Sequence, residues 1–178
     1  AKTFRIEESL AYEIVRKMRG SVAEYPNLDQ AIDHEERKLG FRLAPEQREA
    51  GKMGLTSKLR VITGGPGTGK TSVQKALLDL YKERYPAAKI ACCAPTGKAA
   101  RRMEQATGVH ASTVHRALGL MANEDGQYGD PEMLEADLVL VDEVSMLDVY
   151  LAEKLFRSVA DKSRLILVGD SDQLPSVG

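Results

Sequence analysis

The pattern of apolar and polar positions divides the chain at about residue 41. Before this point, apolar residues recur every three or four positions, which predicts one helix over Glu7–Arg19 and a second over about Leu28–Leu39. Glycines at residues 20 and 40 suit the ends of these two helices. We interpret residues 1–40 as a short N-terminal helical segment, either a lead-in or the tail of a missing N-terminal domain.

From Phe41 onward, β-rich runs alternate with helical stretches. The runs are nearly continuous in apolar residues, as expected for parallel strands that are buried on both faces. We therefore predict an α/β fold with a parallel sheet flanked by helices. The predicted strands are Leu59–Thr63, Lys89–Ala94, Asp137–Asp142 and Arg164–Gly169. The predicted helices are residues 45–53, 70–84, 97–106, 112–120 and 148–160, with one loop over Met121–Glu135.

Charge and cysteine usage narrow the class of protein. Of the 178 residues, 25 are Lys or Arg and 26 are Asp or Glu, so the net charge of −1 excludes a polycationic protein. The adjacent Cys92 and Cys93 form a poor disulfide pair and have no metal-ligand spacing around them, which predicts two reduced core thiols and a cytoplasmic location. No apolar run is long enough to cross a membrane. Because the chain starts at Ala1 without Met, we expect a fragment of a longer protein.

The first predicted strand runs directly into a phosphate-binding pattern. Residues 64–71 fit G-x-x-x-x-G-K-[ST], whose glycines let backbone N–H groups surround phosphate oxygens. Lys70 would reach the β- and γ-phosphates, and the Thr71 hydroxyl would bind Mg²⁺. The pattern predicts ATP and Mg²⁺ as cofactors. The expected nucleotide contacts are Gly64, Gly65, Pro66, Gly67, Thr68, Gly69, Lys70, Thr71 and Ser72.

A pair of acidic residues follows the third predicted strand. Asp142 and Glu143 stand at its carboxyl end, the edge of a parallel sheet where ligands bind. We expect Asp142 to hold Mg²⁺ through water and Glu143 to act as the base that orients and deprotonates the attacking water. The D-x-x-G and N-K-x-D patterns of GTPases do not occur, so ATP hydrolysis is the better interpretation.

These patterns together resemble the RecD-like DNA helicases of superfamily 1, the exonuclease V alpha-subunit family. The resemblance covers about residues 41–178 and implies a RecA-like P-loop NTPase domain of a 5′-to-3′ helicase acting in DNA recombination and repair. It also implies a second RecA-like domain in the same protein, single-stranded DNA as partner, and other exonuclease V subunits as further partners. The motifs are Leu43–Gln47, the P-loop, Ala94–Ala100, Ala111–Arg116, Asp142-Glu143 and Gly169–Pro175.

The resemblance implies roles for two glutamines. Gln47 would select ATP, since its amide can offer both a donor and an acceptor to an adenine edge. Gln173 would sense the γ-phosphate and report to the DNA side. We expect Lys70, Glu143 and Gln173 to carry catalysis.

The net charge near zero conceals a basic segment of the chain. Between residues 94 and 118, Lys98 and three arginines (101, 102 and 116) face one acid, whereas residues 121–143 hold eight acids and no base. Backbone phosphates of single-stranded DNA are the natural partner of such a segment, with little sequence preference. For Arg101 and Arg102, a solvated helix face is an equally good interpretation. The expected DNA contacts, several of them implied by the resemblance, are Pro95, Thr96, Lys98, Thr113 and His115.

Two alternatives remain open at this stage. An AAA+-type ATPase shares the P-loop string and the acid pair, although Gly169-Asp170 stands where such a protein would carry an Asn. The other is a nucleotide-binding module of a larger complex that does not hydrolyse ATP, against which Glu143 argues. Since the arginines of a second domain are not in this sequence, we expect the isolated chain to be nearly inactive.

Overall fold

The structure, a computed structural model of the chain, describes residues 2–20, 24–64, 70–126 and 128–170. Its strands are β1 Leu59–Gly64, β2 Ile90–Ala94, β3 Ala111–Thr113, β4 Leu138–Val141 and β5 Arg164–Asp170. Its helices are α1 Lys2–Met18, α2 Leu28–Leu39, α3 Pro45–Thr56, α4 Lys70–Arg84, α5 Gly97–Thr107, α6 Val114–Ala117 and α7 Val149–Ser158, with a 3₁₀ turn η1 at Val144–Met146.

The five strands form one sheet in the order β1-β5-β4-β2-β3, and every pairing is parallel. The predicted parallel α/β sheet is therefore confirmed. β5 lies between β1, which leads into the P-loop, and β4, which leads into the acid pair. Because all the strands are parallel, their carboxyl ends meet at one edge, where the candidate residues gather.

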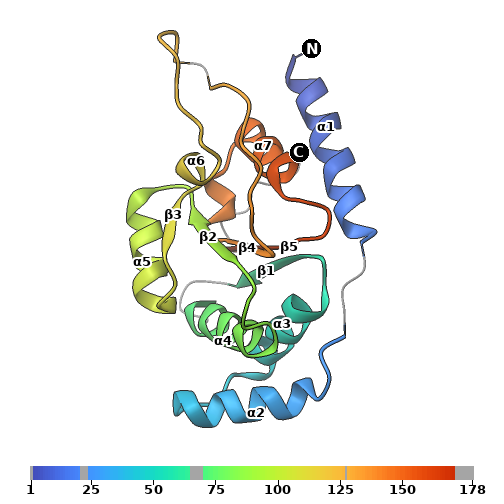
Figure 1. The fold of residues 1–178 in the computed structure, drawn as a ribbon, viewed down its shortest axis with the longest axis vertical. Helices are drawn as coiled ribbons and strands as arrows, with labels where there is room; N and C mark the ends of the chain where they lie inside the picture. The colour runs from blue at the N-terminus through green and yellow to red at the C-terminus, as the bar shows by residue number, and fades with distance from the viewer. Residues whose placement is uncertain (1, 21–23, 65–69, 127, 171–178) are drawn as a thin grey trace.

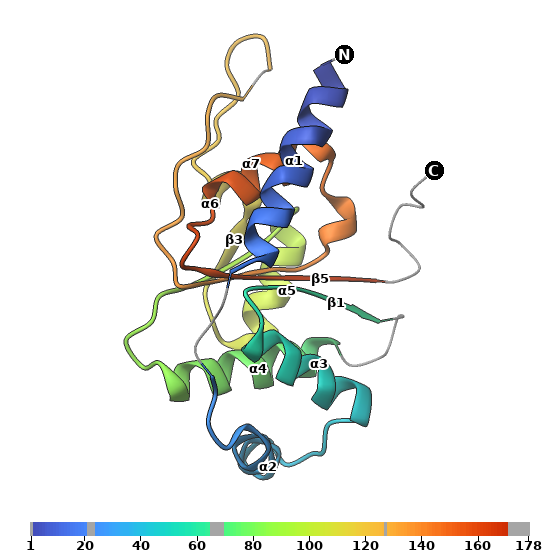
Figure 2. The same ribbon diagram turned by 90° about the vertical axis from the view of Figure 1, so that its right-hand side faces the viewer.

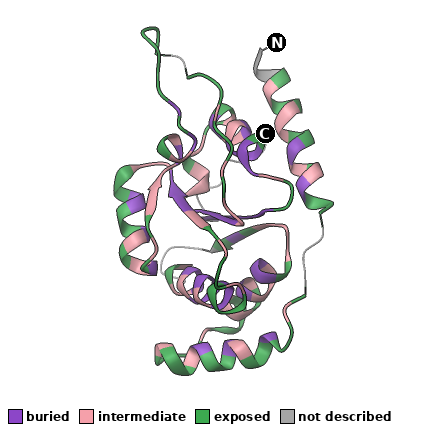
Figure 3. Ribbon diagram, viewed as in Figure 1, coloured by how far each residue is buried: buried purple, intermediate pink, exposed green. Residues whose placement is uncertain are grey.

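Helices cover both faces of the sheet (Figures 1 and 2). On one face, α3, α4 and α5 bury a core around Leu55, Leu77 and Met103. On the other, α7 and α6 bury a second core around Leu155 and Val114. Figure 3 shows the buried strands between these two layers.

The two cysteines of β2 divide between these cores, Cys92 on the α4 side and Cys93 on the α7 side. Both are free thiols, and burial raises the pKa of each to about 12. The predicted core thiols are confirmed, and they are unreactive because almost no thiolate forms near neutral pH.

Most predicted elements lie where expected. α2 and α4 have the predicted bounds, and the other long helices differ by a few residues at their ends. The helix predicted over 112–120 is wrong at both ends, because residues 111–113 form the edge strand β3 beside Cys92–Ala94 and α6 ends at Ala117. This short run of Ala, Ser and Thr has no apolar pattern, so only its backbone pairing with β2 identifies it as a strand.

The two N-terminal helices pack on opposite layers of the fold (Figure 2). α1 lies along α7, where Lys17 donates a buried hydrogen bond of 2.6 Å to the Val159 carbonyl. Arg16 pairs with Asp161 at 2.6 Å, and Ser9 donates to Glu153 at 3.1 Å. Desolvation lowers the pKa of Lys17, so its hydrogen bond to the carbonyl compensates part of the cost of burial.

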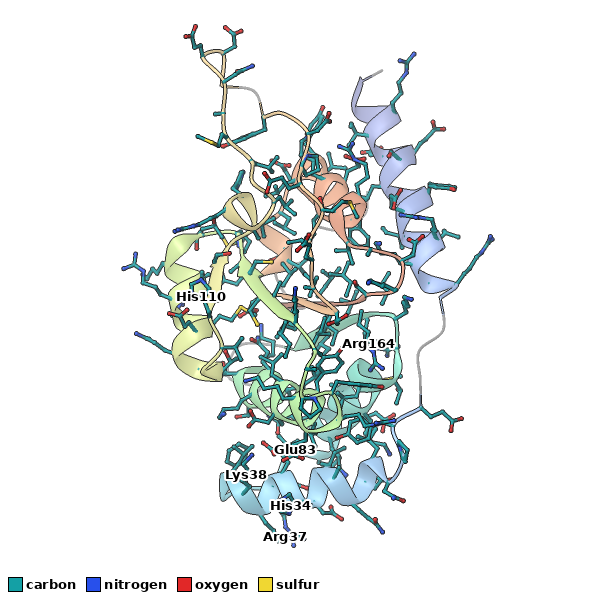
Figure 4. The ribbon with its side chains drawn as sticks, viewed as in Figure 1. His34, Arg37, Lys38, Glu83, His110 and Arg164 are labelled. Atoms are coloured by element: carbon teal, nitrogen blue, oxygen red, sulfur yellow. The ribbon has the colours of Figure 1, made fainter. Side chains whose placement is uncertain are left out.

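α2, which carries Lys38, packs on α4, which carries Glu83 (Figure 4). α2 also brings a buried carboxyl group, Glu35, into this contact. Glu35 is fully buried, and neither side-chain oxygen accepts a hydrogen bond from the described residues. The Nζ of Lys38 lies 3.9 Å from Glu35 and 3.7 Å from Glu83. Burial first, and then the neighbouring Asp79 carboxyl, raise the pKa of Glu35 to about 7. Glu35 and Asp79 can bond each other only when they share a proton.

Stability should therefore depend on pH through Glu35. The folded state holds the Glu35 proton more tightly than the unfolded state. The contribution of protonated Glu35 to the free energy of unfolding is therefore complete below pH 4.5 and is lost as the pH rises to about 7. We expect Glu35→Gln to stabilise the chain at pH 8 by about 1–2 kcal/mol and to flatten its pH dependence. Urea unfolding at pH 5 and pH 8 measures this. The exposed control Glu24→Gln should keep the pH dependence of the parent's unfolding free energy. If Glu35→Gln keeps that pH dependence as well, the assignment to Glu35 is wrong.

Candidate active site

A cavity of about 190 Å³ opens at the carboxyl edge of the sheet, between α4, α5 and the end of β4. Its lining brings together residues far apart in the sequence: Lys70, Thr71, Gln74, Ala99, Arg102, Met103, Ala106, Asp142 and Glu143. Four predicted site residues, Lys70, Thr71, Asp142 and Glu143, therefore share one cavity. The predicted contacts at residues 65–69 and at Gln173 lie outside the described residues and stay predictions.

Lys70 and Thr71, the last two residues of the P-loop string, begin α4. Gly64 ends β1 and pairs with Asp170 of β5. The P-loop string therefore continues from the carboxyl end of β1. The first turn of a helix offers unpaired N–H groups and the positive end of the helix dipole, which favour an anion. Ser72, also predicted as a contact, is half-buried and is not among the residues that line this cavity.

The acid pair is fixed by the backbone at the end of β4. The N–H of Asp142 donates to the Cys93 carbonyl at 3.0 Å, which continues the ladder with β2 by one residue. The N–H of Glu143 donates to Oδ1 of Asp142 at 2.8 Å. Glu143 adopts a left-handed conformation with φ of 52°, which is uncommon for a residue other than Gly and costs about 1–3 kcal/mol. This turn moves the Glu143 side chain out of the strand direction toward α5.

Glu143 contacts Arg102 of α5 across the cavity. The guanidinium Nη2 of Arg102 donates to Oε1 of Glu143 at 3.2 Å. The Arg102 side chain is 62% exposed and that of Glu143 is 31% exposed, so the ion pair lies at the open side of the cavity. The expected base is therefore paired with a cation in this structure.

The residues present fit a magnesium ion. Thr71 and Asp142 bring a hydroxyl and a carboxylate to the same cavity, and oxygen ligands of this kind suit Mg²⁺. One oxygen of Asp142 accepts the Glu143 N–H, which holds the carboxylate in place while it keeps further acceptor capacity. No group of three or more His, Cys, Asp or Glu side chains suited to a metal occurs in the described part of the chain.

Gln47 occupies the first turn of α3 and is not among the described residues that line the cavity. Its Oε1 accepts a hydrogen bond of 2.7 Å from the Ala44 N–H, which caps the helix. This bond gives Gln47 a structural task. Its expected contact with adenine remains a prediction.

The expected DNA contacts lie at the ends of β2 and β3. Ala94 pairs with Thr113, so Pro95 and Thr96 are close to Thr113 and His115 although some 17 residues separate the two segments. Thr96 Oγ1 accepts from the Ala99 N–H at 3.2 Å and caps α5, and Thr113 Oγ1 accepts from the Arg116 N–H at 3.1 Å and caps α6. Each hydroxyl keeps its own proton, which it can donate to a phosphate. Lys98 is exposed in the first turn of α5.

An aromatic pair stands beside these residues. The ring of His115 lies 4.9 Å from that of Tyr128, which belongs to the irregular segment after α6. Tyr128 is 46% exposed, so the pair lies at the protein surface near Thr113. His110, by contrast, lies in the exposed connection between α5 and β3 (Figure 4), where its Nδ1 is 2.7 Å from Glu104. The hydrogen bond from the Ala111 N–H, followed by the one from His110, lowers the pKa of Glu104.

Two residues that line the cavity were not predicted from the sequence as part of the nucleotide site, Gln74 and Arg102. Gln74 is almost fully buried, and its position four residues after Lys70 puts both on one face of α4. A polar residue inside the apolar stripe of this helix was the available signal. Arg102 was left between a DNA contact and a solvated face, and neither interpretation includes its pairing with Glu143.

None of the helices in the described part of the chain is long and apolar enough to span a membrane.

Solved structures with a similar fold include two bacteriophage proteins. The UvsW helicase of bacteriophage T4 matches with a TM-score of 0.58 at 14% identity, over 74% of this chain and 53% of that one. The large terminase of bacteriophage HK97 matches with a TM-score of 0.53 at 12% identity, over 82% and 38%. At such low identities the likeness supports the RecA-like fold alone.

Sequence comparison is more specific. The family model described as "AAA domain" matches residues 47–178. The RecBCD enzyme subunit RecD of Mycolicibacterium smegmatis is 40% identical over 155 residues, and the ATP-dependent RecD2 DNA helicase of Deinococcus radiodurans is 42% identical over 151. The matches cover 74% and 85% of this chain but only 28% and 20% of those relatives. The chain therefore belongs to the AAA domain family and, within it, to the RecD-like helicases, of whose first motor domain it is a representative.

Proposed function

We propose that this chain is the ATP-binding and ATP-hydrolysing motor domain of a 5′-to-3′ DNA helicase that translocates on single-stranded DNA. The observation that carries the proposal is the shared cavity, where Lys70 and Thr71 face Asp142 and Glu143. These four residue types are the ones needed to bind triphosphate, metal and attacking water together. The polarity and the role in recombination and repair rest on the likeness to RecD proteins.

Each residue has a separate task in the proposed reaction. Lys70 and the P-loop N–H groups hold the phosphates, and Thr71 and Asp142 would hold Mg²⁺, which neutralises phosphate charge when it is bound. Glu143 accepts a proton from the water that attacks the γ-phosphorus. Gln173, just after β5, would sense the γ-phosphate, because β5 lies between the P-loop strand and the acid-pair strand.

Single-stranded DNA would lie across the ends of β2 and β3. Thr96, Lys98 and Thr113 offer hydroxyl and ammonium donors to phosphates, and His115 with Tyr128 offers a ring face to a base. The further expected partners are a second RecA-like domain of the same protein and other exonuclease V subunits. We place the protein in the cytoplasm, where buried free thiols stay reduced.

The two alternative functions, an AAA+-type ATPase and a nucleotide-binding module that does not hydrolyse ATP, predict different results in an ATPase assay. An AAA+-type ATPase would hydrolyse ATP without stimulation by single-stranded DNA. A nucleotide-binding module without catalysis would bind ATP but show no turnover. Steady-state ATPase with and without oligo(dT), measured on the full-length protein, separates these from the helicase, for which we expect clear stimulation by DNA.

Nucleotide binding should depend on Lys70. Replacing Lys70 with Ala removes a positive charge next to the β- and γ-phosphates, so the affinity for ATP·Mg²⁺ should fall at least tenfold, or about 1.4 kcal/mol. Isothermal titration calorimetry measures the change, with Lys82→Ala as a control because Lys82 is an exposed cation near the other end of α4. Equal affinities in folded parent and Lys70→Ala protein would refute the phosphate assignment.

A further inference from the structure

The ion pair between Arg102 and Glu143 joins the expected base to the helix that begins at the expected DNA contacts. We infer that Arg102 is a positioning residue that keeps Glu143 engaged until a phosphate of single-stranded DNA takes its place on the guanidinium. The inference deepens the proposed function and rests on it. It gives a physical route by which DNA would stimulate ATP hydrolysis in this domain.

The geometry of α5 places Arg102 at the boundary of two faces. One face, with Ala99, Met103 and Ala106, lines the cavity beside Lys70 and Asp142. Lys98 precedes Arg102 by four residues, so the two cations are neighbours along the helix surface. A phosphate bound by Lys98 would therefore lie within reach of the Arg102 side chain.

The ion pair occupies one of the two carboxylate oxygens of Glu143, Oε1, and so competes with the function expected of this side chain. A carboxylate oxygen that accepts a charge-assisted hydrogen bond has less capacity to accept one from water. The backbone of Glu143 gives little freedom to avoid this contact, because its left-handed conformation is held by bonds to Asp142 and Met146. Release must therefore come from the Arg102 side.

The pair is weak enough to be exchanged. Its arginine side chain is 62% exposed, and exposed ion pairs are stabilised little because water and salt screen them. A DNA phosphate offers arginine a bidentate partner, and it gains further from counterion release along the strand. We therefore expect the Arg102 guanidinium to bind a DNA phosphate when a strand is bound, and to pair with Glu143 when no DNA is present.

If Glu143 and a DNA phosphate compete for the Arg102 guanidinium, removing the Glu143 carboxylate should raise the affinity for DNA. This change can be measured without nucleotide. In the full-length protein, Glu143→Gln frees Arg102 and should tighten binding of fluorescent oligo(dT) by about threefold or more at low salt. Arg102→Gln should abolish this gain, whereas Arg101→Gln should preserve it, because Arg101 is an exposed neighbour on the same helix. A gain of equal size in the Arg102→Gln background would overturn the inference, since it would reflect only the general loss of negative charge.

Steady-state ATPase supplies the second readout. Arg102→Gln should raise the rate without DNA by about fivefold or more while it leaves the DNA-stimulated rate within about twofold, so that the stimulation ratio falls. Arg102→Lys should restore part of the ratio, and Arg101→Gln should leave it unchanged. If Arg102→Gln lowers both rates together and raises KM for ATP, Arg102 holds the nucleotide instead, and the inference is wrong.

Failure of the proposed function would look different. A parent protein that neither binds oligo(dT) nor hydrolyses ATP would refute the proposed helicase motor. A parent that shows DNA-stimulated hydrolysis but no coupling between Arg102 and Glu143 would refute only the inference drawn from the ion pair.

Discussion

Extending this chain through a second motor domain should raise its DNA-stimulated ATPase rate by about 10³- to 10⁵-fold. We expect Lys70 and the P-loop to neutralise one side of the transferring phosphoryl group, whereas exposed Arg102 and half-buried Glu143 pair at the open side of the cavity. In related phosphoryl-transfer sites, an arginine supplied from outside the domain has an effect of this size. The matches span only 20–28% of the RecD relatives, which leaves ample chain for such a domain.

The measurement compares steady-state ATPase of this chain and of the longer protein, each with and without oligo(dT). We expect the isolated chain to bind ATP·Mg²⁺ modestly, bind single-stranded DNA weakly and unwind no duplex, because translocation needs two domains that close and open on ATP. DNA affinity falls as well, because linked binding sites lose their effective-concentration advantage when one is removed. Equal DNA-stimulated rates in both proteins would mean that this chain is a self-sufficient ATPase.

Replacing Glu143 with Gln should slow ATP hydrolysis by about 10²- to 10⁴-fold in the longer protein, with little change in ATP affinity. The substitution keeps the shape of the side chain but removes its ability to take a proton from water. Lys70, Thr71 and Asp142 still surround the phosphates, so binding and chemistry should separate. Single-turnover ATPase and calorimetry measure the two quantities independently.

A control for this variant is Glu135→Gln, which changes an exposed carboxyl group on the segment that precedes β4. Its turnover should match that of the parent. If Glu143→Gln also stays within about threefold of the parent while Asp142→Asn abolishes turnover, then the base has been assigned to the wrong carboxylate.

Strong local patterns made much of the fold predictable. α4 begins at Lys70 and ends at Arg84 as expected, because the P-loop string marks its start and helical propensity extends it. The buried run 138–141 is apolar at every position, so the acid pair had to follow a central strand. A parallel sheet then requires Lys70 and Asp142 to meet at one edge, and they line one cavity.

Local pattern was insufficient where the backbone depends on distant partners. Ala111–Thr113 is a strand because Cys92–Ala94 offers a free edge, a fact that three small residues do not encode.

The sequence by itself predicted the candidate chemistry of this protein, namely a phosphate-binding loop, oxygen ligands for a metal and an acidic base, since each is a short string with its own backbone requirements. Only the tertiary structure decided how that chemistry is arranged. The position of β5 between β1 and β4 belongs to the strand order of the folded sheet, which no single segment of the sequence encodes. Arg102 reaches Glu143, 41 residues later in the chain, because β2 and β4 pair and bring α5 beside the end of β4. Side chains separated in this way meet only after the chain has folded, so no local pattern could have predicted the ion pair.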